Sequence, residues 1–347
     1  MDKYLNKDII IMKKNIAFFV AHFTERGTEV AIYDYARYNE EVLQNRSYII
    51  CFSEVLKNKL NFGSWVANAK DTYDKFSSRF EIIEIDDIHD MTGLIERYDF
   101  NFFYFLTHGG YYETYFELNN RLIWGKCKTI KHCVFMLSVR EADFMICISD
   151  YLIGKYQVNV PVIPHIVNMP DYEGDLRESL GIPKDAIVLG RYGGISEFNV
   201  QCAKDAIVEF MGGEGSEGVY FLFMNTYKFM DHPRVIHLDR SVDMRYKVQF
   251  INTCDAMIHA RDMGETFGLS IAEFSSKNKP VITCPFGDLE HVKILGSKGI
   301  IYRDKGELLG ILGDIRGKIG ARSDWNAYRY YSPGNVMRLF NMLIFEA

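Results

Sequence analysis

The sequence predicts an α/β protein with two doubly wound parallel-sheet domains that face a central cleft. Apolar, strand-like runs alternate with segments of helical periodicity along most of the chain, and this alternation is typical of parallel sheets. The length of 347 residues suits two domains of ordinary size. A proline-punctuated stretch at residues 160–170 passes into a strongly polar one, which indicates a hinge between the domains.

The composition argues against several other classes of protein. Forty basic and 46 acidic side chains give a net charge of −6 without a long run of like charges, so no nucleic-acid partner is expected. No apolar stretch approaches the roughly 18 residues of a membrane-spanning helix, and residues 16–23 lack a signal-peptide cleavage site. The seven cysteines include no C-x-x-C pair, and neither H-E-x-x-H nor D-x-D occurs. We therefore expect a soluble, cytoplasmic protein that binds no metal.

The first domain is expected to open with a strand, a loop, a helix and a second strand. Residues 1–12 are interpreted as an N-terminal extension, after which Ile16 to Ala21 form the first strand. The following loop carries Gly27 but lacks the G-x-G-x-x-G pattern of a dinucleotide-binding turn, which removes most support from a classical dehydrogenase. A helix at residues 30–43 then leads to a strand at 48–52. Further strands are expected at residues 80–85, 100–106, 128–135 and 142–149.

The second domain is expected to begin with a strand at residues 186–190. A glycine-rich loop with Arg191 and Gly193 follows, and then a helix at residues 200–210. A strand, a glycine-rich loop and a helix in this order can bind an anion, and a guanidinium can grip phosphate oxygens in pairs. Further strands are expected at residues 219–224, 234–238, 280–284 and 299–302.

One segment of the second domain carries the strongest functional signal. Residues 251–259 end in a strand, Gly264 and Gly268 follow, and a helix is expected to begin near Phe267. The first amides of that helix, those of residues 267–269, have no partner within the helix, and the helix dipole adds positive charge there, so this end suits a diphosphate.

Two glutamates flank this helix start. Glu265 and Glu273 are eight positions apart, which corresponds to about 12 Å along a helix. Carboxylates accept hydrogen bonds from hydroxyl groups, so the pair favours a ligand with hydroxyls on both sides of its phosphates, such as a nucleotide sugar. The alternative is a surface helix with two solvated glutamates.

The residues around the two glutamates strengthen the functional interpretation. The segment from Glu265 through TFGLSIA to Glu273, followed by NKPVI, resembles the E-x7-E motif of glycosyltransferase family four. This family consists of retaining enzymes with the GT-B architecture of two Rossmann-like domains. The resemblance is strongest at residues 251–284 and extends over most of the chain after residue 12. Residues 27–36 together with 259–274 resemble a virus-encoded branch, for which the compartment is the host cytoplasm.

The resemblance implies transfer of a hexose from a nucleoside-diphosphate sugar to a hydroxyl of a glycan, glycoprotein or lipid, with retention and without a metal or other cofactor. GDP-mannose is the first expectation, and UDP-sugars or other GDP-hexoses stay open. Glu265, Phe267, Gly268 and Leu269 are expected to hold the sugar and phosphate, and Glu273 the ribose. The implied domains are residues 13–165 and 166–325, with the helix at 326–347 crossing back to the first domain.

Three further positions carry over from the family. Arg191, in the loop with Gly193, is expected to balance the leaving diphosphate. His132 and the Gly27 loop are expected to cover the sugar from the first domain, and for His132 a satisfied polar group in the core is the alternative. Catalysis is thus assigned to His132, Arg191 and Glu265.

One departure from the family keeps other functions open. The family has a phosphate-binding lysine several residues after the arginine, whereas this chain has Ser, Glu, Phe and Asn at residues 196–199. A catalytically silent homologue that binds nucleotide sugars, a GT-B sugar-nucleotide epimerase and an NAD-binding oxidoreductase therefore remain alternatives. Weak membrane association and a homo-oligomer are also left open.

Overall fold

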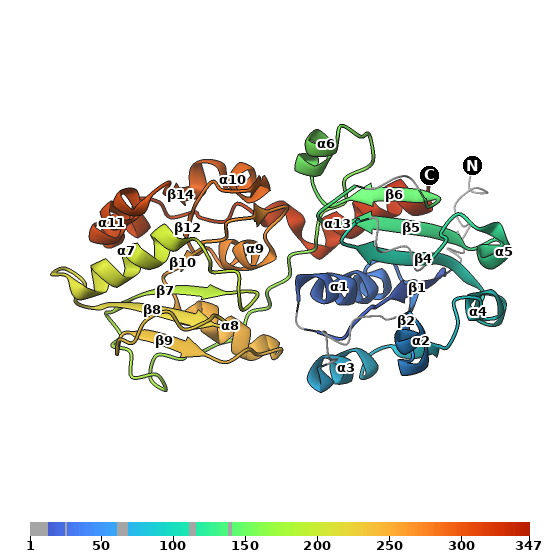
Figure 1. Cartoon of the computed structure of the whole chain (residues 1–347), viewed down its shortest axis with the longest axis horizontal. Coiled ribbons are helices and arrows are strands. Elements are labelled where there is room, and N and C mark those ends of the chain that lie inside the picture. Colours follow the sequence, from blue (N-terminus) through green and yellow to red (C-terminus); the bar gives the residue numbers. More distant parts are fainter. Residues whose placement is uncertain (1–12, 25, 61–68, 111–115, 138–140) are drawn as a thin grey trace, which may run out of the picture.

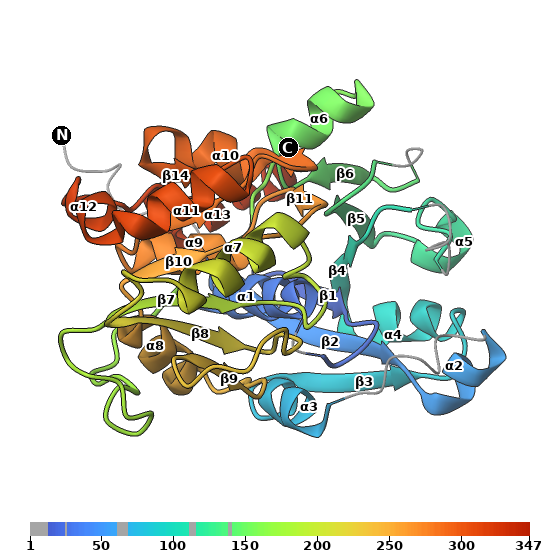
Figure 2. The same cartoon turned by 60° about the vertical axis from the view of Figure 1, so that its left-hand side comes forward.

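The computed structural model describes residues 13–24, 26–60, 69–110, 116–137 and 141–347. The predicted extension at residues 1–12 lies outside the described residues. Two lobes, each built around a sheet, lie side by side (Figure 1), and a view turned by 60° shows how the two sheets lie relative to each other (Figure 2). The predicted α/β class with two parallel, doubly wound sheets is confirmed.

The first sheet has six parallel strands in the order β3-β2-β1-β4-β5-β6. Their bounds are β1 (Asn15–Phe19), β2 (Arg46–Phe52), β3 (Glu81–Ile85), β4 (Phe100–Thr107), β5 (Lys128–Cys133) and β6 (Phe144–Cys147). Alternate residues of β1 enter different cores: Ile16 and Phe18 pack in one, and Ala17 and Phe19 in the other. Because both faces of the sheet are covered, central strands such as β1 and β4 carry apolar side chains on both sides rather than on alternate positions.

Six helices accompany the first sheet among the described residues. They are α1 (Gly27–Glu41), α2 (Glu54–Lys59), α3 (Lys70–Ser77), α4 (Asp90–Tyr98), α5 (Arg121–Trp124) and α6 (Asp150–Tyr156). Helix α1 begins directly at Gly27, so the glycine loop expected from the sequence is also the start of a helix.

The second sheet repeats this plan in the order β14-β12-β10-β7-β8-β9. Its strands are β7 (Ile187–Tyr192), β8 (Val219–Met224), β9 (Val235–Leu238), β10 (Ala256–Ile258), β12 (Val281–Thr283) and β14 (Gly299–Ile301). The accompanying helices are α7 (Gln201–Gly212), α8 (Met244–Thr253), α9 (Leu269–Ser276), α10 (Glu290–Leu295), η1 (Gly296–Lys298), α11 (Lys305–Gly313) and α12 (Ile315–Gly320). A separate parallel pair joins β11 (Gly264–Glu265) to β13 (Asp288–Leu289).

The end of the chain returns to the first domain. After η2 (Arg329–Tyr331), helix α13 (Pro333–Phe340) and the π-helix η3 (Asn341–Phe345) lie beside the first sheet (Figure 1). The Phe340 ring packs against Tyr35 of α1 at 5.6 Å and against Tyr104 of β4 at 6.0 Å between ring centroids. This packing ties the C-terminus to the first sheet. In the parts of the chain that the structure describes, no helix combines the length and apolar composition needed to cross a membrane.

Two boundaries differ from the prediction at places that matter for the site. Strand β7 continues through Arg191 and Tyr192, because these residues pair with Phe223 and Met224 of β8. Helix α9 begins at Leu269, two residues later than predicted, because Gly268 adopts a left-handed conformation with φ of 82°. Arg191 therefore stands in a strand, and Phe267 and Gly268 precede the helix, whose first residue is Leu269.

Ion pairs connect the two domains at α6. Lys155 Nζ lies 2.8 Å from Asp288 Oδ1, and Lys293 Nζ lies 3.4 Å from Asp150 Oδ2. Figures 1 and 2 both show α6 next to α10 of the second domain. Because Asp288 belongs to β13, the first domain contacts the strand pair that carries Glu265.

Candidate active site

Glu265 is held by the short strand pair β11/β13, and two glycines allow that pair to form. Gly264 has φ of 64°, and a Cβ there would lie 2.1 Å from the Asp288 carbonyl oxygen. Gly287 has φ of 61°, and a Cβ there would lie 2.1 Å from the Met263 carbonyl oxygen. Only glycine fits such a close backbone approach in a left-handed conformation. Gly264 and Gly287 thus fix the backbone position of Glu265.

The Glu265 carboxylate lies in a network of cationic and polar groups, and its side chain is 14% exposed. Arg261 Nη1 donates to Glu265 Oε2 at 2.9 Å, and His259 Nε2 lies 3.4 Å from Glu265 Oε1. Burial raises the pKa of Glu265, but the hydrogen bond from His259 and the charge of Arg261 outweigh burial and lower the pKa to about 2. His259 Nδ1 is in turn 2.8 Å from Thr283 Oγ1 at the end of β12. Glu265 is therefore a carboxylate, and an acceptor for hydroxyl groups, across the neutral pH range.

Glu273 lies within α9 and has partners of its own. Lys247 Nζ of α8 donates to Glu273 Oε1 at 2.8 Å, and the Tyr192 hydroxyl donates to Glu273 Oε2. The Lys247 ammonium also stands 4.9 Å from the centroid of the Tyr192 ring. Glu273 is buried, so a ribose that binds it must share or replace one of these two donors.

The turn between the glutamates is anchored from both sides. The Phe267 ring contacts His165, Tyr328 and Tyr331, and the Tyr328 hydroxyl donates to the Phe267 carbonyl at 2.8 Å. No side-chain hydrogen bond caps the start of α9 at Gly268.

The first domain reaches this turn through Gly27. A Cβ on Gly27 would lie 3.4 Å from Leu269 Cδ1, so two residues expected in the site from distant parts of the sequence are brought together.

Arg191 is a buried residue with several partners inside the protein. It donates to the carbonyls of Asn225 at 3.1 Å and Gly194 at 2.8 Å, and to the hydroxyl of Thr226. Burial lowers its pKa to about 10, while the charges of Glu197 and Glu265 act in the opposite direction. Arg191 thus remains a cation that stabilises the glycine-rich loop, and a Cβ at Gly193 would lie 3.0 Å from its Nη2 atom.

Glu197, in the loop after β7, faces the same network. Its Oε1 lies 3.1 Å from Arg261 Nη2, and its Oε2 accepts a hydrogen bond of 3.2 Å from the Gly194 amide. Four charged residues, Arg191, Glu197, Arg261 and Glu265, therefore meet at the carboxyl ends of β7 and β10, where parallel sheets place their ligands.

His132 is separate from this group. Its side chain is fully buried in the first domain, where Nδ1 lies 2.7 Å from the Tyr104 hydroxyl and Nε2 lies 2.8 Å from the Ile163 carbonyl. Burial lowers its pKa to about 3. Both ring nitrogens thus have partners within the core, which matches the alternative interpretation of this residue, and we do not carry a catalytic His132 into the proposal below.

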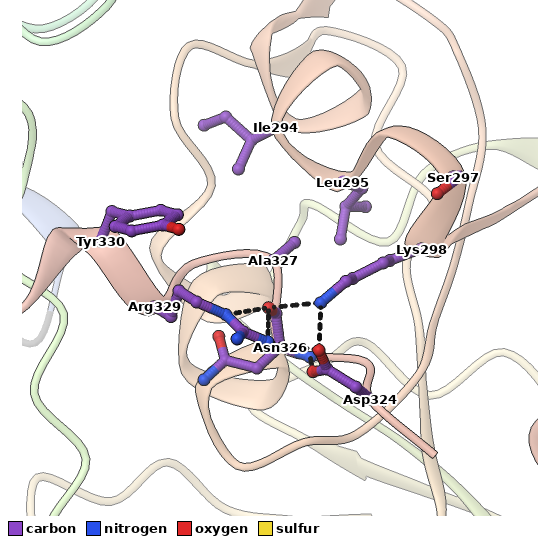
Figure 3. Close-up of a pocket in the computed structure, with 9 residues that line it drawn as sticks. All are labelled: Ile294, Leu295, Ser297, Lys298, Asp324, Asn326, Ala327, Arg329 and Tyr330. Carbon is purple, nitrogen blue, oxygen red and sulfur yellow. Dashed lines mark hydrogen bonds and ion pairs between the residues drawn. The ribbon is translucent and has the colours of Figure 1, made fainter. Parts of the chain in front are cut away.

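A pocket of about 350 Å³ lies elsewhere, between α10 and the segment before α13 (Figure 3). Lys298 Nζ lies 2.9 Å from Asp324 Oδ2, and Arg329 also pairs with Asp324. Lys298 and Arg329 thus share the single carboxylate of Asp324, and the pocket contains none of the residues predicted from the sequence. Among the described residues, no group of three or more His, Cys, Asp or Glu is arranged to hold a metal ion.

No protein-family model matches the sequence, and no curated protein sequence matches it. Solved structures do match. Alr3699/HepE from Anabaena, solved with UDP-glucose, superposes with a TM-score of 0.67 at 15% identity over 96% of this chain and 98% of that one. A glycosyltransferase from Rickettsia africae superposes with a TM-score of 0.67 at 15% identity, over 97% and 100% of the two chains.

The chain has the GT-B fold. The N-terminal domain of a trehalose-6-phosphate phosphatase from Candida albicans also matches, with a TM-score of 0.66 at 11% identity over 98% of each chain. At such identities the likeness establishes the GT-B fold, and the reaction has to be argued from the residues.

The sequence analysis missed several residues of this candidate site. His259 and Arg261 stand just before Glu265, and their position beside the motif was the available signal. Glu197 occupies the stretch where the family lysine was sought. Lys247 gave no signal, because nothing in the sequence of α8 relates it to Glu273.

Proposed function

We propose that the protein is a retaining glycosyltransferase of the family four type. It moves a hexose from a nucleoside-diphosphate sugar to a hydroxyl of a glycan, glycoprotein or lipid, without a metal or other cofactor. The observation that carries this proposal is the Glu265 carboxylate, kept ionised beside Arg261 at the uncapped start of α9. The binding of UDP-glucose by HepE on the same fold supports it.

In this proposal each group has a role that suits its chemistry. Glu265 accepts hydrogen bonds from sugar hydroxyls, and the first amides of α9 donate to the diphosphate. Glu273 accepts from the ribose hydroxyls. Arg191 fixes the loop of Gly193 and Gly194 and adds positive charge behind the leaving phosphates.

The proposed reaction needs no covalent intermediate. The bond from the sugar to the diphosphate breaks as the acceptor oxygen attacks from the same face, and the acceptor proton passes to the leaving phosphate. Because the departing group carries away negative charge, the surrounding cations and amides stabilise it most in the transition state.

The proposal also concerns which nucleotide sugar is the donor. GDP-mannose remains the expectation from the sequence, and UDP-glucose joins it because HepE was solved with that sugar nucleotide. The nucleobase would lie toward Glu273, and the described residues there do not single out guanine or uracil. The virus-encoded branch, the acceptor, the cytoplasmic location and the oligomeric state stay predictions.

Calorimetric titration with UDP-glucose, GDP-mannose and NAD tests the proposal. We expect saturable binding of at least one nucleotide sugar and none of NAD. Release of nucleoside diphosphate, first with water and then with candidate acceptors, tests the transfer step. Binding of NAD without any nucleotide sugar would contradict the proposal.

A catalytically silent nucleotide-sugar-binding protein is the second candidate. It is favoured by one observation, the acidic Glu197 in the stretch where the family has a phosphate-binding lysine. Such a protein would bind the donor and release no nucleoside diphosphate with any acceptor. An epimerase would instead convert the donor without an acceptor, which product analysis by chromatography distinguishes.

A further inference from the structure

The loop after β7 and the loop after β10 are joined side by side through Asn199. The Asn199 side chain donates to Asp262 Oδ1 at 2.8 Å and accepts from the Asp262 amide at 3.0 Å. Its own amide donates to the Ala260 carbonyl at 2.9 Å. Because these bonds fix the two loops on both sides, Glu197 of one loop faces Arg261 of the other.

The groups that bind the Glu197 carboxylate are of the kinds that bind phosphates in other proteins. One oxygen pairs with the Arg261 guanidinium at 3.1 Å, and the other accepts from the Gly194 amide at 3.2 Å. A guanidinium beside an amide of a glycine-rich loop suits any oxyanion, and a phosphate offers the same kind of oxygen as a carboxylate. A Cβ at Gly194 would lie 2.7 Å from Glu197 Cδ, so glycine is what admits the carboxylate here.

From this geometry we infer that Arg261 and the Gly194 amide form the subsite for a donor phosphate, and that Glu197 occupies this subsite until the donor displaces it. The inference rests on the proposed function and adds to it an internal competitor. In this inference Arg261 binds the phosphate that a lysine of the loop binds in the family.

The two partners differ in how easily they can separate. The Glu197 side chain is 38% exposed, whereas that of Arg261 is 12% exposed. Arg261 has a second carboxylate partner in Glu265, at 2.9 Å. When Glu197 rotates into solvent, Glu265 therefore keeps the guanidinium in place. Departure of one carboxylate also leaves the group of Arg191, Arg261 and Glu265 with a net positive charge, which favours a phosphate.

A purely structural role for Glu197 makes the opposite prediction. If its bonds served only to close the turn from Gly194, removal of the carboxylate would loosen the loop and weaken donor binding or leave it unchanged. If the Glu197 carboxylate competes with the donor, its removal should instead make ligand binding tighter. This gain should occur only for ligands that carry phosphates.

The experiment measures affinities for UDP, GDP, uridine and guanosine by calorimetry in the full chain and in Glu197→Gln and Glu197→Ala variants. For whichever diphosphate binds the wild-type protein, we expect both variants to bind about threefold to tenfold more tightly, since a partly exposed ion pair is lost. The nucleosides should show no gain. Glu214→Gln removes an exposed charge of the same domain and should leave every affinity unchanged.

The same measurements in an Arg261→Lys variant test whether the effect depends on the pairing of Glu197 with Arg261. Arg261→Lys should weaken diphosphate binding, and addition of Glu197→Gln should then give a smaller gain than in the wild-type background. Diphosphate binding by the wild-type protein with equal or weaker binding by both Glu197 variants would overturn the inference alone. Failure of the wild-type protein and all variants to bind UDP or GDP would overturn the proposed function as well.

Discussion

Glu265 lies just before the turn that leads into α9, and Glu273 lies within that helix, yet the two are held in different ways. Glu265 is bound by Arg261 and His259 in a network that continues to Glu197. Glu273 is bound by Lys247 and Tyr192, which offer it one ammonium and one hydroxyl. The same residue type thus has two settings: the Glu265 carboxylate shares Arg261 with a second carboxylate, whereas Glu273 is more deeply buried between Lys247 and Tyr192. On the proposed function, we therefore expect changes at Glu265 to affect mainly the transfer step and changes at Glu273 to affect mainly donor binding.

The largest effect should come from Glu265→Gln. The change keeps the size of the side chain but removes the charge that holds Arg261 and accepts from the sugar, so kcat/KM for transfer should fall about 100-fold. Steady-state kinetics with a fixed acceptor measure it, and Glu214→Gln is the matched control on an exposed glutamate. Activity within a factor of about two of wild type would remove Glu265 from the reaction.

A smaller effect, on binding, is expected for Glu273→Gln. Loss of a charged acceptor for the ribose costs on the order of 1.5–3 kcal/mol, and competition from Lys247 and Tyr192 places the expected change near the low end, about tenfold in donor Kd. Titration with the donor measures it, while kcat should change little. Tyr192→Phe is the companion variant, because it removes a competing donor and leaves the carboxylate. An unchanged donor Kd in Glu273→Gln would exclude the ribose role.

The contact from the first domain should have a still smaller effect. A methyl group at Gly27 meets Leu269 Cδ1 at 3.4 Å, an ordinary contact, so Gly27→Ala should be nearly neutral. Gly27→Val adds branches that must displace Leu269, and kcat/KM should fall about fivefold through misplacement of the donor. Thermal unfolding serves as the control for stability. Equal kcat/KM values of the two variants would show that the contact between Gly27 and Leu269 does not affect the transfer reaction.

Acid stability gives a separate test of the network around Glu265. The pKa of Glu265 is lowered to about 2 despite burial, below its ordinary value of 4.5. Its ionised form therefore contributes stability that is fully present above pH 4.5 and is lost as the pH falls toward 2. Urea unfolding should show that the free energy of unfolding of the wild-type protein falls more steeply below pH 4.5 than that of Glu265→Gln. Parallel curves in that range would contradict the low pKa.

The fold class and the order of most elements could be predicted from the sequence. Strand and helix periodicity gave both sheets, and the glycines around Glu265 gave its turn, because these signals are local. The partners of the glutamates were not accessible in this way. Tyr192, Lys247 and Glu273 come from three elements, and only packing of α8 and α9 beside β7 brings them together. For His132 the sequence left two interpretations open, and it did not reveal the hydrogen bonds of the ring to Tyr104 and to the Ile163 carbonyl, which depend on packing.

The facing glycines at 264 and 287 have a consequence for how this protein tolerates mutation. Each would place a Cβ against the backbone on the opposite strand, so a substitution at either position disturbs both. No compensating change elsewhere can make room, because the obstacle is main chain rather than a side chain. A sequence fingerprint for this arrangement therefore has to include the glycine at 287, which lies well beyond the glutamate pair.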